Sequence, residues 1–77
     1  MTFHHISSNP EILGGKPCIK GTRISVEIIL EWLASGASVQ NILESYPHLS
    51  GESIQEAILY AASFMKNEIL IEAKRVA

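Results

Sequence analysis

The sequence predicts a mainly α domain: a three-helix helix-turn-helix bundle with a short β-hairpin at its N-terminal end. Three observations predict it. Apolar residues recur at helical spacing in three stretches, a serine stands just before each stretch, and a Gly- and Pro-rich segment precedes all of them. Because the chain has only 77 residues, we expect a single domain with a hairpin arm over residues 1–24 and the helical bundle over residues 25–77.

The arm combines strand signals with basic charge. Phe3–Ile6 is predicted as a short strand, and the triplets at 18–20 and 22–24 form a tight ribbon around Gly21, with Pro17 favouring an exposed edge position. The segment 14–24 holds half of the six Lys and Arg residues, namely Lys16, Lys20 and Arg23. Residues 26–65 hold none and carry five Glu, so the basic charge is separated from an acidic body.

The first two predicted helices are bounded by strong local signals. The first begins after Ser25, a good N-cap, and ends at Gly36, where a left-handed residue fits. The second begins after Ser38 and ends before Pro47, because proline disfavours a helical conformation at the residue preceding it. Both helices are therefore expected to be short.

The third helix begins after Ser50, and its pattern can extend as far as Ala73, with two alternatives left by the sequence: a helix that continues past Met65 or one that stops there. At 100° per residue, one face collects the predicted core stripe, Ile54, Ile58, Ala61, Ala62, Met65 and Ile69. A second stripe, roughly a quarter-turn or more away, contains Ala57, Tyr60, Phe64 and Ile71, and Leu70 lies outside both. A chain this small cannot cover one helix on all sides.

Two interpretations of the charge pattern remain open. In a helix-turn-helix domain the first turns of the last helix face the major groove, which makes Ser53 and Gln55 candidates for contact with DNA. Lys16, Lys20 and Arg23 would then contact phosphates. The alternative is that these charges solvate an edge strand and that Glu52 and Glu56 belong to an ordinary acidic helix face.

The apolar content predicts a protein interface. Hydrophobic residues make up 47% of the chain, which favours a homodimer or another protein partner. The alternative is a helix that is simply buried in the domain's own core. We expect the contact at four residues of the last predicted helix, Tyr60, Phe64, Leu70 and Ile71.

Catalytic, metal and membrane functions have little support. The chain has no Asp, its one cysteine is Cys18, and the adjacent His4 and His5 would point to opposite faces of a strand. We therefore expect no enzyme activity, no metal site and no cofactor. No apolar run is long enough for a membrane span and the first residues lack signal-peptide features, so we expect a cytoplasmic protein.

Several motifs together resemble the small bacterial family called domain of unknown function 433. They span about residues 6–65 and are Asn9–Pro17, Ile19–Ile24, Ala34–Ser38, Tyr46–Ser50 and Ala57–Ala62. The resemblance implies a homeodomain-like three-helix fold with an N-terminal β-hairpin. It also implies an antitoxin of a type II toxin–antitoxin pair that binds its own operator DNA and neutralises a toxin resembling a PIN-like ribonuclease. Lys66–Ala77 lies outside the recognisable block, where an antitoxin would hold its toxin. The rival hypothesis is a protein-interaction module with the same fold that never binds DNA.

Overall fold

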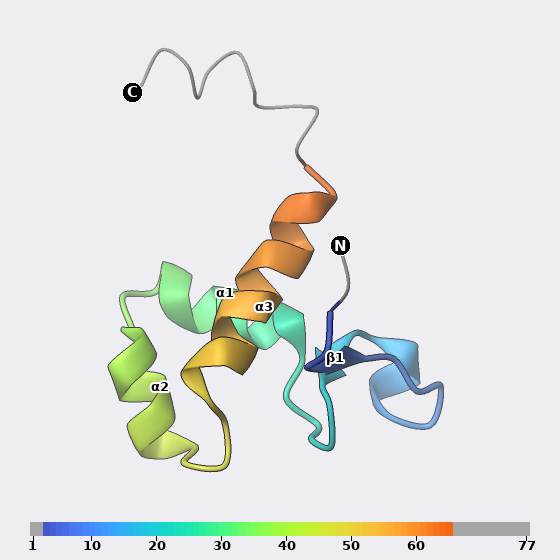
Figure 1. Cartoon of the computed structure of the whole chain (residues 1–77), viewed down its shortest axis with the longest axis horizontal. Coiled ribbons are helices and arrows are strands. Elements are labelled where there is room, and N and C mark those ends of the chain that lie inside the picture. The colour runs from blue at the N-terminus through green and yellow to red at the C-terminus, as the bar shows by residue number, and fades with distance from the viewer. Residues whose placement is uncertain (1–2, 66–77) are drawn as a thin grey trace.

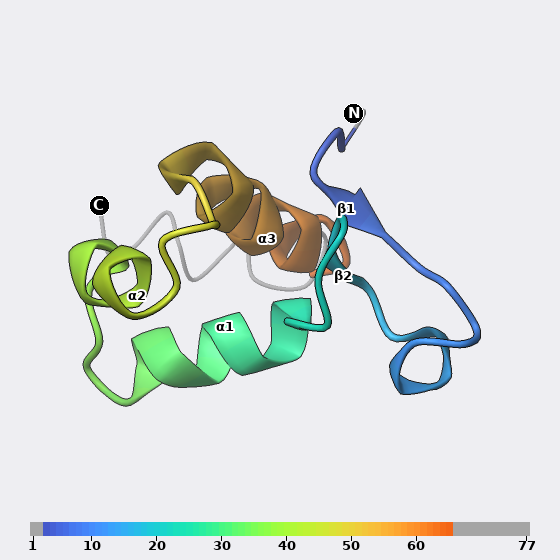
Figure 2. The same ribbon diagram turned by 90° about the horizontal axis from the view of Figure 1, so that it is seen from below.

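The computed structural model describes residues 3–65 and contains three helices and a two-stranded antiparallel sheet. Helices α1 and α3 lie side by side, with α2 at one end of the pair and the strands at the other (Figures 1 and 2). The predicted mainly α fold with an N-terminal hairpin is confirmed. The elements are β1 (Ile6–Ser7), a 3₁₀ turn η1 (Leu13–Gly15), β2 (Cys18–Ile19), α1 (Val26–Ala34), α2 (Val39–Ser45) and α3 (Gly51–Ser63).

The hairpin differs in detail from its prediction. Its first strand is Ile6–Ser7, not Phe3–Ile6, and Ile6 lies opposite Ile19. The residues after β2 form a closed turn, because the Ile19 N–H donates to the Ile24 carbonyl at 2.9 Å and the Thr22 N–H donates to the Ile19 carbonyl at 3.0 Å. The turn reverses at Gly21, whose φ of +81° favours glycine. Both residues of β2 are buried, and its outer edge is not exposed as expected, because the Ile19 N–H bonds to the Ile24 carbonyl and the Val26 N–H to the Pro17 carbonyl, each at 2.9 Å.

All three helices begin where the serines predict. The Ser25 hydroxyl accepts from the Ile28 N–H at 3.0 Å. Ser38 and Ser50 each form a capping box, in which the side chain of the third helical residue also accepts from the backbone of the cap. Each such cap is worth about 1 kcal/mol, which matters for helices this short.

The described part of α3 ends earlier than the prediction. The Phe64 and Met65 N–H groups donate to carbonyls three residues back, at 3.2 and 3.0 Å. This tighter bonding pattern ends the α-helix after Ser63. The expected helix over residues 64–65 is therefore wrong. The rest of the predicted extension, residues 66–73, lies outside the described residues.

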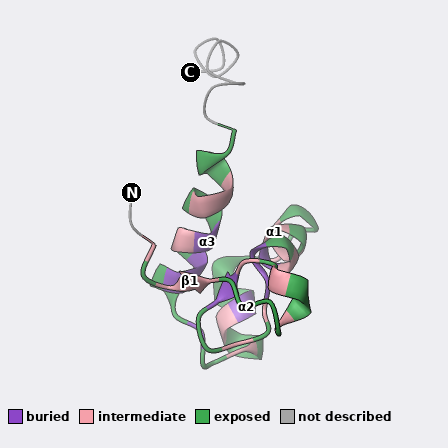
Figure 3. Ribbon diagram, turned by 90° about the vertical axis from the view of Figure 1, so that its right-hand side faces the viewer, coloured by how far each residue is buried: buried purple, intermediate pink, exposed green. Residues whose placement is uncertain are grey.

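The core lies where α3 meets α1, α2 and the hairpin (Figure 3). Its buried hydrophobic residues are Ile19, Val26, Ile29, Ile42, Leu49, Ile54 and Ala57. The predicted core stripe of α3 is only partly right: Ile54 is fully buried, but Ile58 is 39% and Met65 48% exposed, and Ala62 is also exposed. Because α3 packs against both α1 and β1, its buried arc is rotated toward Ala57. Ile69 lies outside the described residues.

Two isoleucines of α3 provide a matched test of this rotation. Ile54→Ala should lower the free energy of unfolding by about 2–5 kcal/mol, because the side chain is fully enclosed and its loss leaves a cavity. Ile58→Ala should cost roughly 1 kcal/mol or less, since its side chain already contacts water. Denaturant unfolding of both variants measures the two losses of unfolding free energy. Equal losses would show that the buried face of α3 is not the one that contains Ile54.

Candidate functional site

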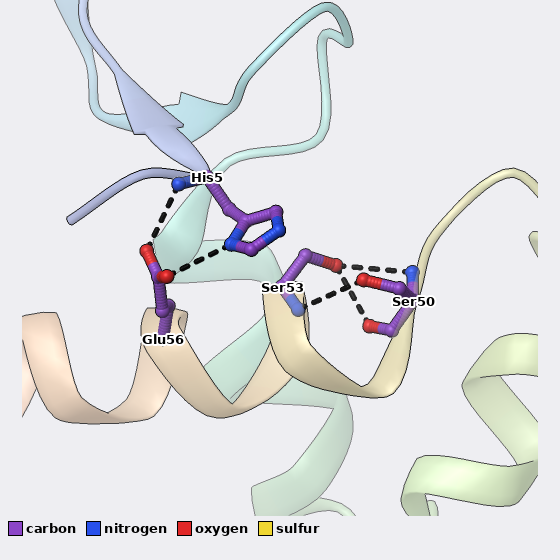
Figure 4. A network of polar contacts seen from close by, with 4 residues as sticks. All are labelled: His5, Ser50, Ser53 and Glu56. Atoms are coloured by element: carbon purple, nitrogen blue, oxygen red, sulfur yellow. Dashed lines mark hydrogen bonds and ion pairs between the residues drawn. The ribbon is translucent and has the colours of Figure 1, made fainter.

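A contact between residues 51 positions apart fastens the hairpin to α3. The backbone N–H of His5 donates to Oε1 of Glu56 at 2.9 Å. The ring Nδ1 of His5 lies 2.8 Å from Oε2 of Glu56 (Figure 4). The His5 carbonyl accepts from the Lys20 N–H at 2.7 Å. We call the pairing of His5 with Glu56 the clasp. Through the clasp and the backbone bond from Lys20, His5 joins three parts of the domain: the start of β1, the turn after β2 and helix α3.

The clasp keeps Glu56 ionised. The hydrogen bond from the His5 backbone lowers the pKa of Glu56 below its ordinary value of 4.5, partial burial opposes that shift, and the His5 imidazole adds to the lowering. The Glu56 side chain is 18% exposed and that of His5 37%. The carboxylate is thus held in its charged form at the surface between the hairpin and α3.

Two of the three predicted phosphate contacts lie in the turn after β2. Lys20 and Arg23 are exposed there, and neither forms an ion pair within residues 3–65. We call Lys20–Arg23 the basic turn. It projects toward the same side of the molecule as the turn between α2 and α3 (lower edge of Figure 1).

Lys16 differs from the other two cations. Its Nζ lies 2.8 Å from Oε1 of Glu27 at the start of α1, and both side chains are more than half exposed. The hydrogen bond raises the pKa of Lys16 and lowers that of Glu27. A phosphate would have to compete with this carboxylate, so Lys16 is a weaker candidate than Lys20 or Arg23.

Of the two α3 residues predicted to enter the DNA major groove, one is exposed and the other is buried. Gln55 is exposed and lines a shallow hollow of about 290 Å³ with His4, His5, Glu52, Glu56 and Leu59. Ser53 is only 2% exposed, and its hydroxyl donates to the Ser50 carbonyl at 2.8 Å and accepts from the Ser50 N–H at 3.2 Å (Figure 4). Ser53 is therefore a capping residue and is not available to a base or phosphate.

A second surface lies at the far end of α3. The partly buried Tyr60 packs edge-on between Phe3 and Phe64, with ring centroids 5.2 and 5.1 Å apart. Phe64 is 69% exposed. It borders an open groove of about 330 Å³ between α1 and α3, which we call the apolar groove; Pro17, Val26, Leu30, Ala61 and Met65 are among its lining residues. The other two predicted interface residues, Leu70 and Ile71, lie outside the described residues.

An aromatic stack orients the turn that leads into α3. The rings of Trp32 on α1 and Tyr46 lie 5.0 Å apart and nearly parallel, at 12°, and His48 packs edge-on to Tyr46. The stack fixes the α2–α3 turn against α1. Sequence reasoning did not find it, because helical periodicity does not reveal which aromatic residues meet across a turn.

The described residues offer little for metal chemistry. Over residues 3–65, no group of three or more His, Cys, Asp or Glu side chains is placed to hold a metal ion. The Cys18 thiol is buried and donates to the Lys16 carbonyl at 3.3 Å. None of the helices in the described part is long and apolar enough to cross a membrane.

Comparisons with known proteins identify the family. The family model for DUF433, described as a protein of unknown function, matches residues 6–61, and the chain belongs to this family. An uncharacterized protein, y4eO, of Sinorhizobium fredii is 43% identical over 56 residues; the match covers 73% of this chain but only 25% of that protein, so the chain spans about a quarter of its relative's length. A crystal structure of a DUF433 member from Anabaena variabilis is similar, with a TM-score of 0.72 and 27% identity over 95% of this chain and 69% of that one.

The clasp predicts how stability depends on pH. Since the pKa of Glu56 is lower in the folded state than in the unfolded chain, the clasp stabilises the fold above the ordinary value of 4.5, and this contribution is lost as pH falls through the folded value. The difference in unfolding free energy between the parent and Glu56→Gln should therefore be largest near about pH 6 and shrink toward about pH 3.

Denaturant unfolding at several pH values measures this difference. Glu44→Gln, a change at an exposed glutamate on α2, serves as the control and should show no comparable convergence with the parent. A difference between parent and Glu56→Gln that stays constant across the pH range would show that the clasp is not sensitive to the ionisation of Glu56.

Proposed function

We propose that this DUF433 member is an antitoxin-like regulator that binds its own operator DNA and a toxin partner. The observation that carries the DNA part is the clasp, which fastens the basic turn beside the exposed face of α3. The antitoxin part, including a toxin resembling a PIN-like ribonuclease, rests on the resemblance of the sequence motifs to this bacterial family. A cytoplasmic setting fits the single cysteine, Cys18, which can form no disulfide within the chain.

In the proposed complex, the start of α3 faces the major groove and the basic turn contacts the adjacent backbone. Gln55 is the exposed side chain suited to adenine, and Lys20 and Arg23 supply the charge for phosphates. The Glu56 carboxylate is bonded to His5, Glu52 is exposed, and both negative charges oppose binding. With a net charge of −2 the affinity of one copy is low, so a homodimer on two half-sites is the form expected to bind.

The proposed protein interface is the apolar groove with the aromatic pair Tyr60 and Phe64 at its edge. Fully burying a large apolar side chain contributes about 1.5–3 kcal/mol, and Phe64 leaves most of its surface to water. A second copy or a toxin segment covering this groove would remove that exposed surface. Leu70 and Ile71 stay predicted contributors to the same contact.

A second candidate function is a protein-interaction module that binds no DNA. The absence of Lys and Arg between residues 26 and 65 favours it, because the exposed side of α3 then offers only acidic, polar and apolar side chains. Under this hypothesis the apolar groove is the functional surface and the basic turn is only solvated. The two hypotheses differ in what the basic turn contributes.

Removing the basic turn's charges separates the two hypotheses. The double variant Lys20→Ala/Arg23→Ala should weaken binding to promoter DNA and reduce the slope of log K against log salt by about two, because two phosphate contacts are lost. A gel-shift or anisotropy titration at several salt concentrations measures the slope, with and without the product of the neighbouring gene.

Lys16→Ala is the matched control for this titration. It also removes one basic side chain of the arm, but one that is paired with Glu27, so its effect on the slope should be smaller per charge. Promoter binding that is unchanged in the double variant would exclude the basic turn from the DNA contact. No binding by the parent at any salt concentration would favour the interaction module.

Charge placed at the apolar groove should break the protein contact. Phe64→Glu is expected to convert an oligomeric parent to monomer, or to abolish its complex with the neighbouring gene product, because a carboxylate cannot be buried there without a partner. Light scattering after size exclusion measures the mass, and circular dichroism checks that helix content is kept. Ala62→Glu, also exposed near the end of α3, is the control. A monomeric parent whose partners are unaffected by Phe64→Glu would refute the interface.

A further inference from the structure

We propose that His5 is a positioning residue whose protonation strengthens nucleic-acid binding, so that the affinity of the proposed surface rises as pH falls. This inference rests on the proposed DNA-binding function and concerns the regulation of that same surface. His5 need not contact DNA itself. It acts by holding the basic turn against α3 and by balancing the charge of Glu56.

The geometry gives His5 two separate contacts with one carboxylate. Its backbone N–H reaches Oε1 of Glu56 and is present at every pH used for binding studies. Its Nδ1 reaches Oε2 and must carry a proton to donate. The Glu56 carboxylate can accept from either the neutral imidazole with its proton on Nδ1 or the doubly protonated ring. The clasp therefore survives in both charge states, while the charge of the surface changes.

The position of the ring allows this change. The His5 side chain is 37% exposed, so the ring exchanges protons with solvent, and histidine is the side chain that ordinarily changes charge between about pH 5 and 8. The charged groups around it are Glu52 and Glu56 from α3, His4 from its own segment and Lys20, whose backbone bonds to it from the basic turn. In the described residues no other histidine forms an ion pair with α3.

Protonation of His5 changes the balance between attraction and repulsion at this surface. With a neutral ring, the carboxylates of Glu52 and Glu56 oppose a phosphate that approaches Lys20 and Arg23. With a charged ring, Glu56 faces a full positive charge at 2.8 Å and its field is largely cancelled. The lowered pKa of Glu56 keeps its carboxylate in the charged form that the ring faces. The surface thus gains one positive charge without losing the clasp.

The test measures promoter-DNA binding by the full-length chain at about pH 8 and about pH 5.5, each at several salt concentrations. For the parent, affinity at fixed salt should rise at the lower pH, and the rise should shrink as salt is added, because a charge that acts without touching a phosphate is screened. His5→Asn offers an amide nitrogen to Glu56 but cannot become charged, so the pH-dependent increase should disappear; the readout is the ratio of this variant's own affinities at the two pH values.

His4→Asn is the matched control, since it removes the neighbouring histidine, which lines the same hollow but forms no ion pair with Glu56. It should keep the increase, and His48→Asn, in the α2–α3 turn, should keep it too. If the parent binds promoter DNA with no pH-dependent increase, or if His5→Asn keeps the increase, this inference is wrong and the proposed function stands. If the parent binds no DNA at either pH, both are wrong.

Discussion

The packing of α1 against α3, through the fully buried Ile29 and Ile54, is the contact on which the rest of the described domain depends. The helices are seven to thirteen residues long, which is too short for stability in isolation. They persist because each buries an apolar face in this one core and because a serine caps each start. α2 and the hairpin then pack against different parts of α3, the hairpin through Glu56 and Tyr60, so candidate surface residues on both sides are positioned by this helix.

The domain keeps two kinds of surface apart along α3. Around the first two turns lie Gln55 and Glu56, the α3 residue of the clasp, where polar contacts dominate. At its far end lie Phe64 and the apolar groove, where apolar side chains meet water. The two surfaces occupy adjacent stretches of the same helix, around Gln55 and Glu56 in one case and around Tyr60 and Phe64 in the other.

Much of the fold could be predicted from sequence, and the reason is local chemistry. Ser25, Ser38 and Ser50 start the helices because a short hydroxyl side chain caps backbone donors within its own segment. The rotation of α3 was predicted wrongly, since periodicity identifies an apolar stripe but not which side the hairpin will cover. Ser53 shows the same limit: its type and position suit a base contact, yet the capping box and burial occupy it. The pairing of His5 with Glu56 had no sequence signal, because nothing local connects residues so far apart.

That separation also has a consequence for the order in which the protein is made. The arm that contains His5 leaves the ribosome before α3, because its partner there is synthesised 51 residues later. The two-residue strands offer the arm few contacts of its own, so it gains its place only after α1 and α3 have met and closed the intervening loop. The hairpin thus docks onto a helix that is made after it, and a nascent chain stalled before Glu56 would present a basic arm with no helix to hold it.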